Sequence, residues 1–375
     1  MVSVLPTSIL FVSQFFPSSR SGQTGGTISN LNMLRSLARK VEVCVLSFDS
    51  KSTEEDFAGE AFRVISRPAP PWRAPQLIRH WQAFVRAEVS RVVAQRPRPD
   101  ALIATTSTLA AFDACPPEVA RIALVRAFEN FGLRCPWVSF RQRINLGKLA
   151  AVRRFEDPRL MRKADGVFTN SLFMRSAIAS RFGVKADRIH ALTQSLNVAP
   201  SETCAPPNTI GFVTRGRDKG VSVILEIARR SPDLTYLVYG HDGDLPSELP
   251  ANVRWQGWAS DRSAMFASAK LWLVPSLWAE PFGRVSIEAQ AADRAVLVAD
   301  HGGLPETVFD SRFRIEGFNP TYWLSRMRDL LALSCEDIRA NGARTRAAFS
   351  DDVHDVRLRE TLGAAMELHG RNKDV

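Results

Sequence analysis

Short apolar segments alternate with helical patterns along most of this 375-residue chain, and the alternation limits the folds it can adopt. Parallel strands joined by helices form sheets that are covered on both faces. The first half therefore predicts an α/β domain with strands at 9–11, 41–48, 101–104, 122–125 and 167–169, and helices at 27–39, 75–95, 149–163 and 172–182.

The alternation pauses near residue 196 and then restarts. Residues 200–208 contain three prolines and show no periodicity, which indicates an interdomain linker. Beyond it, strands are expected at 210–214, 235–239, 253–255, 271–274 and 295–299, and helices at 221–230, 263–268, from 283, at 320–332 and at 352–368.

The length allows two domains, each with its own core. We predict two doubly wound, Rossmann-like domains, at 1–195 and 196–350, that face a cleft. The C-terminal helix within 351–375 could cross back to the first domain. Ligands of such sheets bind at the carboxyl ends of the strands.

The composition narrows the cellular locations that we expect for the protein. The sequence contains no run of eighteen apolar residues, so no transmembrane helix is expected. The opening segment, 2–16, lacks a basic start and is more typical of a buried strand than of a signal peptide. The five cysteines have neither disulfide nor zinc-site spacing. These observations favour a cytoplasmic protein.

Positive charge is concentrated in the first half. Residues 1–195 hold 28 Lys and Arg against 15 Asp and Glu, whereas residues 196–375 hold 21 against 24, so the halves carry +13 and −3 and sum to +10. The densest stretches are 63–98 and 134–163. Such a face can dock on anionic lipid or bind nucleic acid, or can simply be solvated. The asymmetry favours the membrane surface, at the inner face of the cell membrane.

Residues 274–288, Val-Pro-Ser-Leu-Trp-Ala-Glu-Pro-Phe-Gly-Arg-Val-Ser-Ile-Glu, predict a ligand site. A buried strand ends before Pro275, and a loop carries Glu280. Pro281 is expected in the first turn of the next helix. Gly283 would let a ligand approach the backbone, and the helix start suits a phosphate. Glu288 then lies about 8 Å along the helix axis. Alternatively, both acids are surface residues near a helix start.

This stretch resembles the glutamate, seven residues, glutamate motif of retaining glycosyltransferases of the GT-B fold, family four (glycosyl transferases group 1). Residues 295–306, which include Gly-Gly-Leu-Pro-Glu, extend the resemblance. It implies that Glu280 contacts donor-sugar hydroxyls and that Glu288 holds the ribose. It also implies that the backbone at Phe282, Gly283 and Arg284 contacts sugar or phosphate.

Two further loops resemble the family. Gly25 and Gly26 follow the first strand, where the family has a glycine-rich loop that can approach a diphosphate. Lys219, and Arg215 in preference to Arg217, match the cations that neutralise the diphosphate, although their spacing is about one residue shorter than usual. Cations in a dry site stabilise charge on a leaving group. Plain turns could explain either loop.

One segment departs from the family. Many members carry a histidine near 124–130, and this chain has none there. Arg126 and Glu129 are weaker candidates for acceptor or sugar contacts. Asp242 and Asp244 have the form of a metal site but are typical of a turn. We therefore predict no metal and no cofactor.

The resemblance thus implies a nucleotide-sugar-dependent glycosyltransferase of hexosyltransferase type that retains the anomeric configuration. It also implies that 1–195 is the acceptor-side domain and that 196–350 is the nucleotide-sugar-binding domain. The enzyme's donor would be a nucleotide-sugar. UDP-sugars are preferred over GDP-sugars only because they are the more frequent donors. Its acceptor would be a lipid-linked or glycan hydroxyl in bacterial surface-polysaccharide biosynthesis. The missing histidine leaves open a non-catalytic nucleotide-sugar-binding scaffold. A basic nucleic-acid-binding protein is a further alternative, but no recognition motif supports it.

Overall fold

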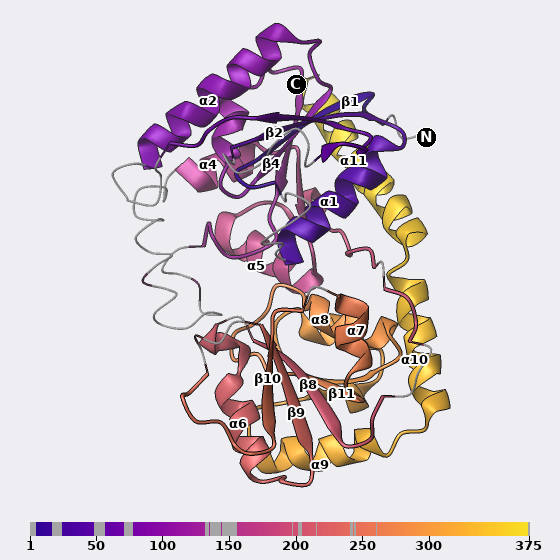
Figure 1. Ribbon diagram of the computed structural model, residues 1–375. Coiled ribbons are helices and arrows are strands. Elements are labelled where there is room, and N and C mark those ends of the chain that lie inside the picture. Colours follow the sequence, from indigo (N-terminus) through magenta and orange to yellow (C-terminus); the bar gives the residue numbers. More distant parts are fainter. Residues whose placement is uncertain are drawn as a thin grey trace. The chain divides into compact units, whose positions relative to one another are not determined.

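A computed structural model describes residues 5–16, 25–48, 57–70, 78–131, 135, 144, 156–196, 198–201, 205–214, 216–240, 243, 245–259 and 261–373. The chain divides into two compact units. The described residues up to Ser195, together with those from Asp351 onward, form the first unit, and residues from Leu196 to Ser350 form the second. Figure 1 shows each unit built around its own sheet.

The first unit contains a seven-stranded parallel sheet in the order β3-β2-β1-β4-β5-β6-β7. Its central strands are almost fully buried, as expected for strands covered on both faces. The strands are β1 (Ser8–Ser13), β2 (Glu42–Ser47), β3 (Arg63–Ser66), β4 (Ala101–Thr105), β5 (Ala120–Leu124), β6 (Gly166–Thr169) and β7 (Ile189–Ala191).

The last helix of the sequence packs on this first sheet. It is α11 (Asp351–Lys373), and its Leu358 and Leu362 are buried in the same core as Leu124. A Cβ atom added at Gly166 of β6 would lie 2.8 Å from the Cβ of Ala365, so glycine permits the close approach of α11. The other helices of this unit are α1 (Gly25–Ala38), α2 (Ile78–Gln95), α4 (Glu156–Lys163) and α5 (Leu172–Phe182).

The second unit contains a six-stranded parallel sheet in the order β10-β9-β8-β11-β12-β13. Strands β11 and β12 are wholly buried. The strands are β8 (Thr209–Thr214), β9 (Thr235–Gly240), β10 (Val253–Gly257), β11 (Leu271–Val274), β12 (Ala295–Ala299) and β13 (Arg314–Ile315).

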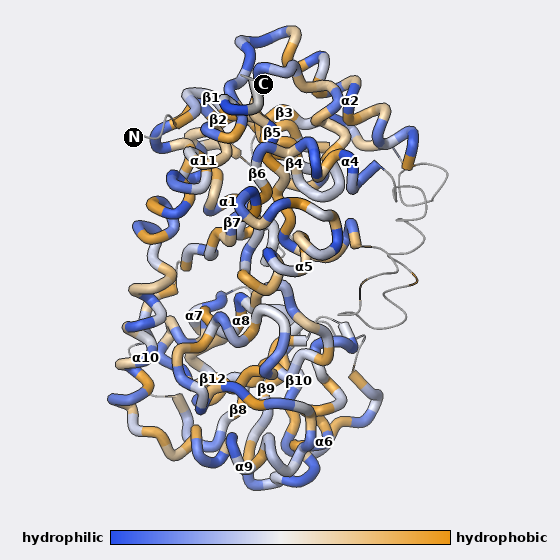
Figure 2. The backbone as a smooth tube through the Cα atoms, turned by 180° about the vertical axis from the view of Figure 1, so that it is seen from behind, coloured by the Kyte–Doolittle hydropathy of each residue, from blue (hydrophilic) through white to orange (hydrophobic). Residues whose placement is uncertain are grey.

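Large aromatic side chains fill the core of the second unit. Trp272 and Trp323 are fully buried, and Tyr239 stacks on Trp272 with ring centroids 5.8 Å apart. Figure 2 shows apolar residues concentrated along the strands, whereas the outer helices alternate in character. The helices are α6 (Val221–Arg229), α7 (Arg262–Ala267), α8 (Arg284–Ala291), α9 (Pro320–Leu331) and α10 (Cys335–Ala348).

The predicted α/β class with two doubly wound units is confirmed, and most expected elements are present within a few residues. Sequence patterns missed β3, β7 and β13, which are two to four residues long, and α10. The buried face of α10 includes Gly342 and Thr345, so it lacks the large apolar stripe that predicts a helix. Within the described part of the chain, no helix is long and apolar enough to cross a membrane.

Candidate functional site

The loop between β11 and α8 carries the most distinctive sequence motif. Helix α8 begins at Arg284, with Gly283 as its N-cap, so the expectation that Pro281 lies in the first helical turn was wrong. Gly283 adopts φ 121°, and a Cβ atom there would lie 2.4 Å from Leu304 Cδ2. Glycine therefore suits this backbone conformation independently of any ligand, because another residue would be strained there and would displace the end of the Leu304 side chain.

Glu280 lies at the centre of a polar contact network. Its side chain is only 9% exposed, and Oε1 accepts hydrogen bonds from Lys219 Nζ at 2.7 Å and from Ser276 Oγ. Its backbone oxygen accepts a bond from Gly303 N at 2.7 Å. These contacts join the loops that follow β8, β11 and β12. The carboxyl ends of three adjacent strands thus bring Lys219 and Glu280 together across 61 residues of sequence.

Lys219 remains accessible within this network. Its side chain is 26% exposed, and Nζ lies 5.5 Å from the ring centroid of Trp278. The Leu277 backbone N–H donates to Asp218 O at 2.8 Å, which fixes the lysine loop against the glutamate loop. An ammonium group has three donors, so Lys219 can hold Glu280 and bind a further anion at the same time.

Glu288, the second acid of the motif, is 1% exposed and pairs with two arginines. Oε1 accepts bonds from Arg284 Nε at 3.0 Å and Nη2 at 2.8 Å. Oε2 accepts a bond from Arg262 Nη2. The Arg284 side chain is 11% exposed, whereas that of Arg262 is 40% exposed, so Arg262 is the more movable partner.

Arg262, Ser276 and His301 are contacts that the sequence reasoning did not identify as parts of this site. Arg262 opens α7 after Asp261, and no local motif connects it with Glu288. His301 Nε2 lies 2.6 Å from Ser276 O; a carbonyl only accepts, so the ring donates and ties the two loops. A contact between His301 and residue 276 leaves no signature in the sequence.

The remaining predicted residues lie elsewhere. Gly25 and Gly26 begin α1 in the first unit and are exposed. Arg126 follows β5, is half-buried, and its Nη2 contacts Met33 Sδ at 3.7 Å, while Glu129 is exposed. Phe282 is buried and packs edge-on against Phe349.

Arg215, which was predicted as a diphosphate contact, and Asp242 and Asp244, which were weighed as a metal site and set aside, lie outside the described residues. Among the side chains that the structure does describe, no group of three or more His, Cys, Asp or Glu residues is arranged to hold a metal ion.

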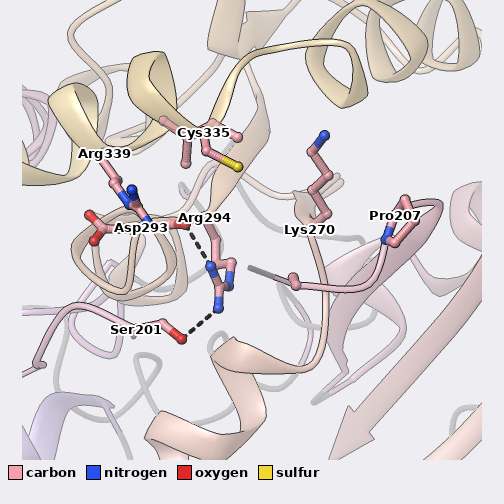
Figure 3. A pocket seen from close by; sticks show the side chains of 9 residues that line it. Ser201, Pro207, Lys270, Asp293, Arg294, Cys335 and Arg339 are labelled. Carbon is pink, nitrogen blue, oxygen red and sulfur yellow. Dashed lines mark hydrogen bonds between the residues drawn. The ribbon is translucent and has the colours of Figure 1, made fainter. Parts of the chain in front are cut away.

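The opposite, amino edge of the second sheet holds a cavity of about 80 Å³ (Figure 3). Arg294 is 5% exposed there, and its Nη2 donates to Ser201 Oγ at 2.6 Å and its Nη1 to Asp293 O at 2.9 Å. Lys270 Nζ donates to Leu331 O at 2.7 Å. These contacts occupy Arg294 and Lys270 with backbone and linker oxygens, which is the pattern of a structural brace.

Comparison with known families decides which family the chain belongs to. The family described as "Glycosyl transferases group 1" matches residues 199–345, and the family described as "Glycosyl transferase 4-like domain" matches residues 24–193. The chain belongs to the group 1 glycosyltransferases, family four. The two matched regions fall in the two structural units.

Curated relatives of this glycosyltransferase match parts of it. A D-inositol 3-phosphate glycosyltransferase of Streptomyces avermitilis is 39% identical over 111 residues, covering 28% of this chain and 24% of the relative. That of Segniliparus rotundus is 32% identical over 173 residues, covering 40% and 37%. A phosphatidyl-myo-inositol mannosyltransferase of Mycobacterium tuberculosis is 33% identical over 93 residues, covering 22% and 25%. The matches thus span well under half of each relative.

Solved structures resemble the whole glycosyltransferase. HepE of Anabaena, crystallised with UDP and glucose, aligns with a TM-score of 0.72 and 18% identity over 94% of this chain and 98% of that one. Sucrose-phosphate synthase of Thermosynechococcus elongatus aligns with a TM-score of 0.75 and 17% identity over the same shares. At this identity the likeness establishes the fold, and it supports the two-domain GT-B architecture.

Proposed function

We propose that this glycosyltransferase moves a hexosyl group from a nucleotide-sugar to a hydroxyl of a lipid-linked or glycan acceptor, with retention of configuration. The contact between Lys219 and Glu280 carries this proposal. It supports the proposal because an ammonium group that could bind a leaving phosphate and a carboxylate that could accept sugar hydroxyls lie together at the carboxyl edge of one sheet, where open α/β sheets bind their ligands.

Donor binding would depend first on the positive charge at the carboxyl edge of the second sheet. Lys219 would bind a diphosphate oxygen while it keeps its bond to Glu280, and the backbone N–H groups at 282–284 would add the positive end of α8. We assign the same role to Arg215, and to the backbone at Gly25 and Gly26. Because these groups supply positive charge, the proposal requires neither a metal ion nor a cofactor.

Glu288 would hold the ribose hydroxyls. Both of its oxygens already accept bonds from arginines, and it is almost fully buried. A ribose hydroxyl can reach Oε2 if Arg262, the more exposed partner, swings away. Arg284 would stay in place and keep the carboxylate oriented.

The transfer step would take place on one face of the sugar. The bond between the anomeric carbon and the phosphate oxygen breaks, and its electron pair leaves with the diphosphate. The acceptor oxygen bonds to the same carbon from the same side, and its proton passes to the departing phosphate oxygen. Lys219 stabilises the charge that develops on that oxygen, a contribution that is often the largest in catalysis. Glu280 orients the sugar hydroxyls.

The acceptor and the cellular setting are proposed from coarser features. HepE was crystallised with UDP and with UDP-glucose, which supports a UDP-sugar donor. The relatives named for phosphatidyl-myo-inositol mannosyl transfer support a lipid acceptor. The basic first half would hold the cytoplasmic enzyme at an anionic membrane surface. Arg126 and Glu129 would contact the acceptor or sugar, and the pathway would be surface-polysaccharide biosynthesis.

A thermal-shift panel with UDP, GDP, ADP and TDP tests the donor assignment. A ligand at a hundred times its dissociation constant stabilises a protein by about 2.7 kcal/mol, so the cognate nucleotide should raise the Tm well above the others. Radiolabelled sugar should then pass from the matching nucleotide-sugar to acceptor or water, and Glu280→Gln should abolish this. If no nucleotide raises the Tm, the proposed function is wrong. Binding without turnover would instead identify a scaffold.

A further inference from the structure

Three uncharged polar side chains lie in the core of the second unit, next to the loop that carries Glu280. Ser286, Gln290 and Thr307 are each fully buried, although the core around them is largely apolar. Ser286 and Gln290 belong to α8, and Thr307 ends the short helix η8 (Leu304–Thr307) that follows β12. Because a buried polar group costs free energy unless it is hydrogen-bonded, the partners of these three side chains define their role.

Gln290 joins three elements through one amide group. Its Nε2 donates to Thr307 O at 2.8 Å and to Ser286 O at 3.1 Å. Its Oε1 accepts a bond from Asn341 Nδ2 of α10 at 3.0 Å. Both ends of the amide are thus bonded, and α8, η8 and α10 are connected at a single buried side chain.

A pair of hydroxyl groups completes the network. Thr307 Oγ1 lies 2.8 Å from Ser286 Oγ and 2.6 Å from Leu304 O. Ser286 lies in the first turn of α8, so the pair connects the start of this helix with the loop after β12, residues 300–307. A buried polar network whose members are satisfied favours one arrangement of the elements that it joins.

The loop after β12 in turn holds the backbone of the Glu280 loop. Gly303 N donates to Glu280 O at 2.7 Å, and His301 Nε2 donates to Ser276 O at 2.6 Å. Glu288 is held differently, because its partner Arg284 lies four residues earlier in the same helix. The hydroxyl pair therefore acts on the placement of Glu280 and not on that of Glu288.

We propose that Ser286, Gln290 and Thr307 are positioning residues for sugar transfer, because they fix the loop after β12 against α8 and thereby hold Glu280 in place. The inference rests on the proposed function, in which Glu280 orients the sugar hydroxyls. The three side chains are fully buried, so they act through Glu280 and not by contact with a substrate. A misplacement of about 1 Å caused by a distant change can slow a reaction about 100-fold.

Removing both hydroxyl groups tests the proposal with little effect on folding. In Ser286→Ala/Thr307→Val both partners become apolar, and such paired replacements are nearly neutral for stability. Gln290 Nε2 keeps its bonds to the two backbone oxygens. The kcat should fall about 10- to 100-fold, because the Glu280 loop is less well placed. The KM for the nucleotide-sugar and the Kd of UDP should change less than about 3-fold, because no bond to the ligand is removed.

A matched hydroxyl pair in the same unit is the control. Ser231 Oγ lies 2.7 Å from Tyr236 OH and donates to Ile227 O at 2.8 Å, and both side chains are fully buried. The pair lies near the amino end of β9, away from the Glu280 loop. Ser231→Ala/Tyr236→Phe should therefore leave kcat unchanged.

Two further variants separate positioning from folding. Thr307→Ser keeps the hydroxyl group, so its kcat should remain close to that of the unmodified protein. Gln290→Leu leaves Thr307 O and Asn341 Nδ2 without their bonds to the amide, so it should lower both kcat and the Tm.

Hydrogen exchange gives a readout that does not depend on turnover. The Gly303 amide, which is bonded to Glu280 O, should exchange faster in Ser286→Ala/Thr307→Val than in Ser231→Ala/Tyr236→Phe. Unchanged exchange at Gly303 would overturn the inference. So would an unchanged kcat in Ser286→Ala/Thr307→Val, or an equal fall in kcat in the control pair. These results leave the proposed function standing, whereas the absence of any sugar transfer by the unmodified protein defeats the proposed function itself.

Discussion

The carboxyl edges of the two sheets differ in the polar groups that they bury. In the second unit, Lys219 pairs with Glu280, and Glu288 pairs with Arg284 and Arg262. In the first unit, neutral groups such as Asn170 and His354 are buried with unsatisfied acceptors. Paired charges hold a site ready for an anion, whereas the first edge buries mostly uncharged polar groups, such as Gln14 and Asn30. The comparison teaches that one fold, used twice, presents two different chemistries.

Of the substitutions at the carboxyl edge of the second sheet, Lys219→Ala should have the largest effect. Turnover should fall about 10²–10³-fold, because the variant loses the cation that stabilises the leaving diphosphate. Steady-state sugar transfer measures this. The control is Lys270→Ala, at the amino edge of the same sheet, where Nζ donates to Leu331 O. Full activity in Lys219→Ala would remove this residue from the mechanism.

Glu288→Ala should weaken nucleotide binding by about 1.5–3 kcal/mol, the range for hydrogen bonds to a charged group. Isothermal titration with UDP measures the loss. Glu316→Ala, at an exposed position of the same unit, should bind normally. An unchanged affinity in Glu288→Ala would rule against the ribose assignment.

Ser201→Ala tests the amino edge of the second sheet, where we expect the residues to have a structural role and no role in ligand binding or catalysis. The change leaves Arg294 Nη2 without its bond to Ser201 Oγ and should lower the free energy of unfolding by about 1–3 kcal/mol. Urea unfolding measures this, and UDP affinity should remain that of the unmodified protein. A drop in affinity would show that the two edges are coupled.

Arg262→Ala should have the smallest effect, and it should increase the affinity for UDP. Arg262 occupies Glu288 Oε2, so in the unmodified protein the ribose must displace this arginine, which costs free energy. Without Arg262 this cost is absent, so UDP should bind about 2- to 10-fold more tightly. The UDP affinity of Arg262→Lys should lie between that of Arg262→Ala and that of the unmodified protein. Weaker binding in Arg262→Ala would mean that Arg262 holds the nucleotide itself.

The local sequence determined the fold class and much of the second unit's edge. Strand and helix periods reflect which side chains are buried within a few residues, so 271–274 and 172–182 are predictable from neighbours alone. Glu280 and Glu288 were identified because both lie in one loop and helix. Their proposed roles come from the family resemblance and stay predictions.

Only the tertiary structure decided which distant residues meet. The bond between Lys219 and Glu280 depends on β8 lying beside β11, and the pairing of Arg262 with Glu288 depends on where α7 packs. The same holds for His354, which reaches Thr193 because α11 packs on the first sheet. Strand order and helix packing are set by the burial of whole surfaces, and no short sequence pattern encodes them.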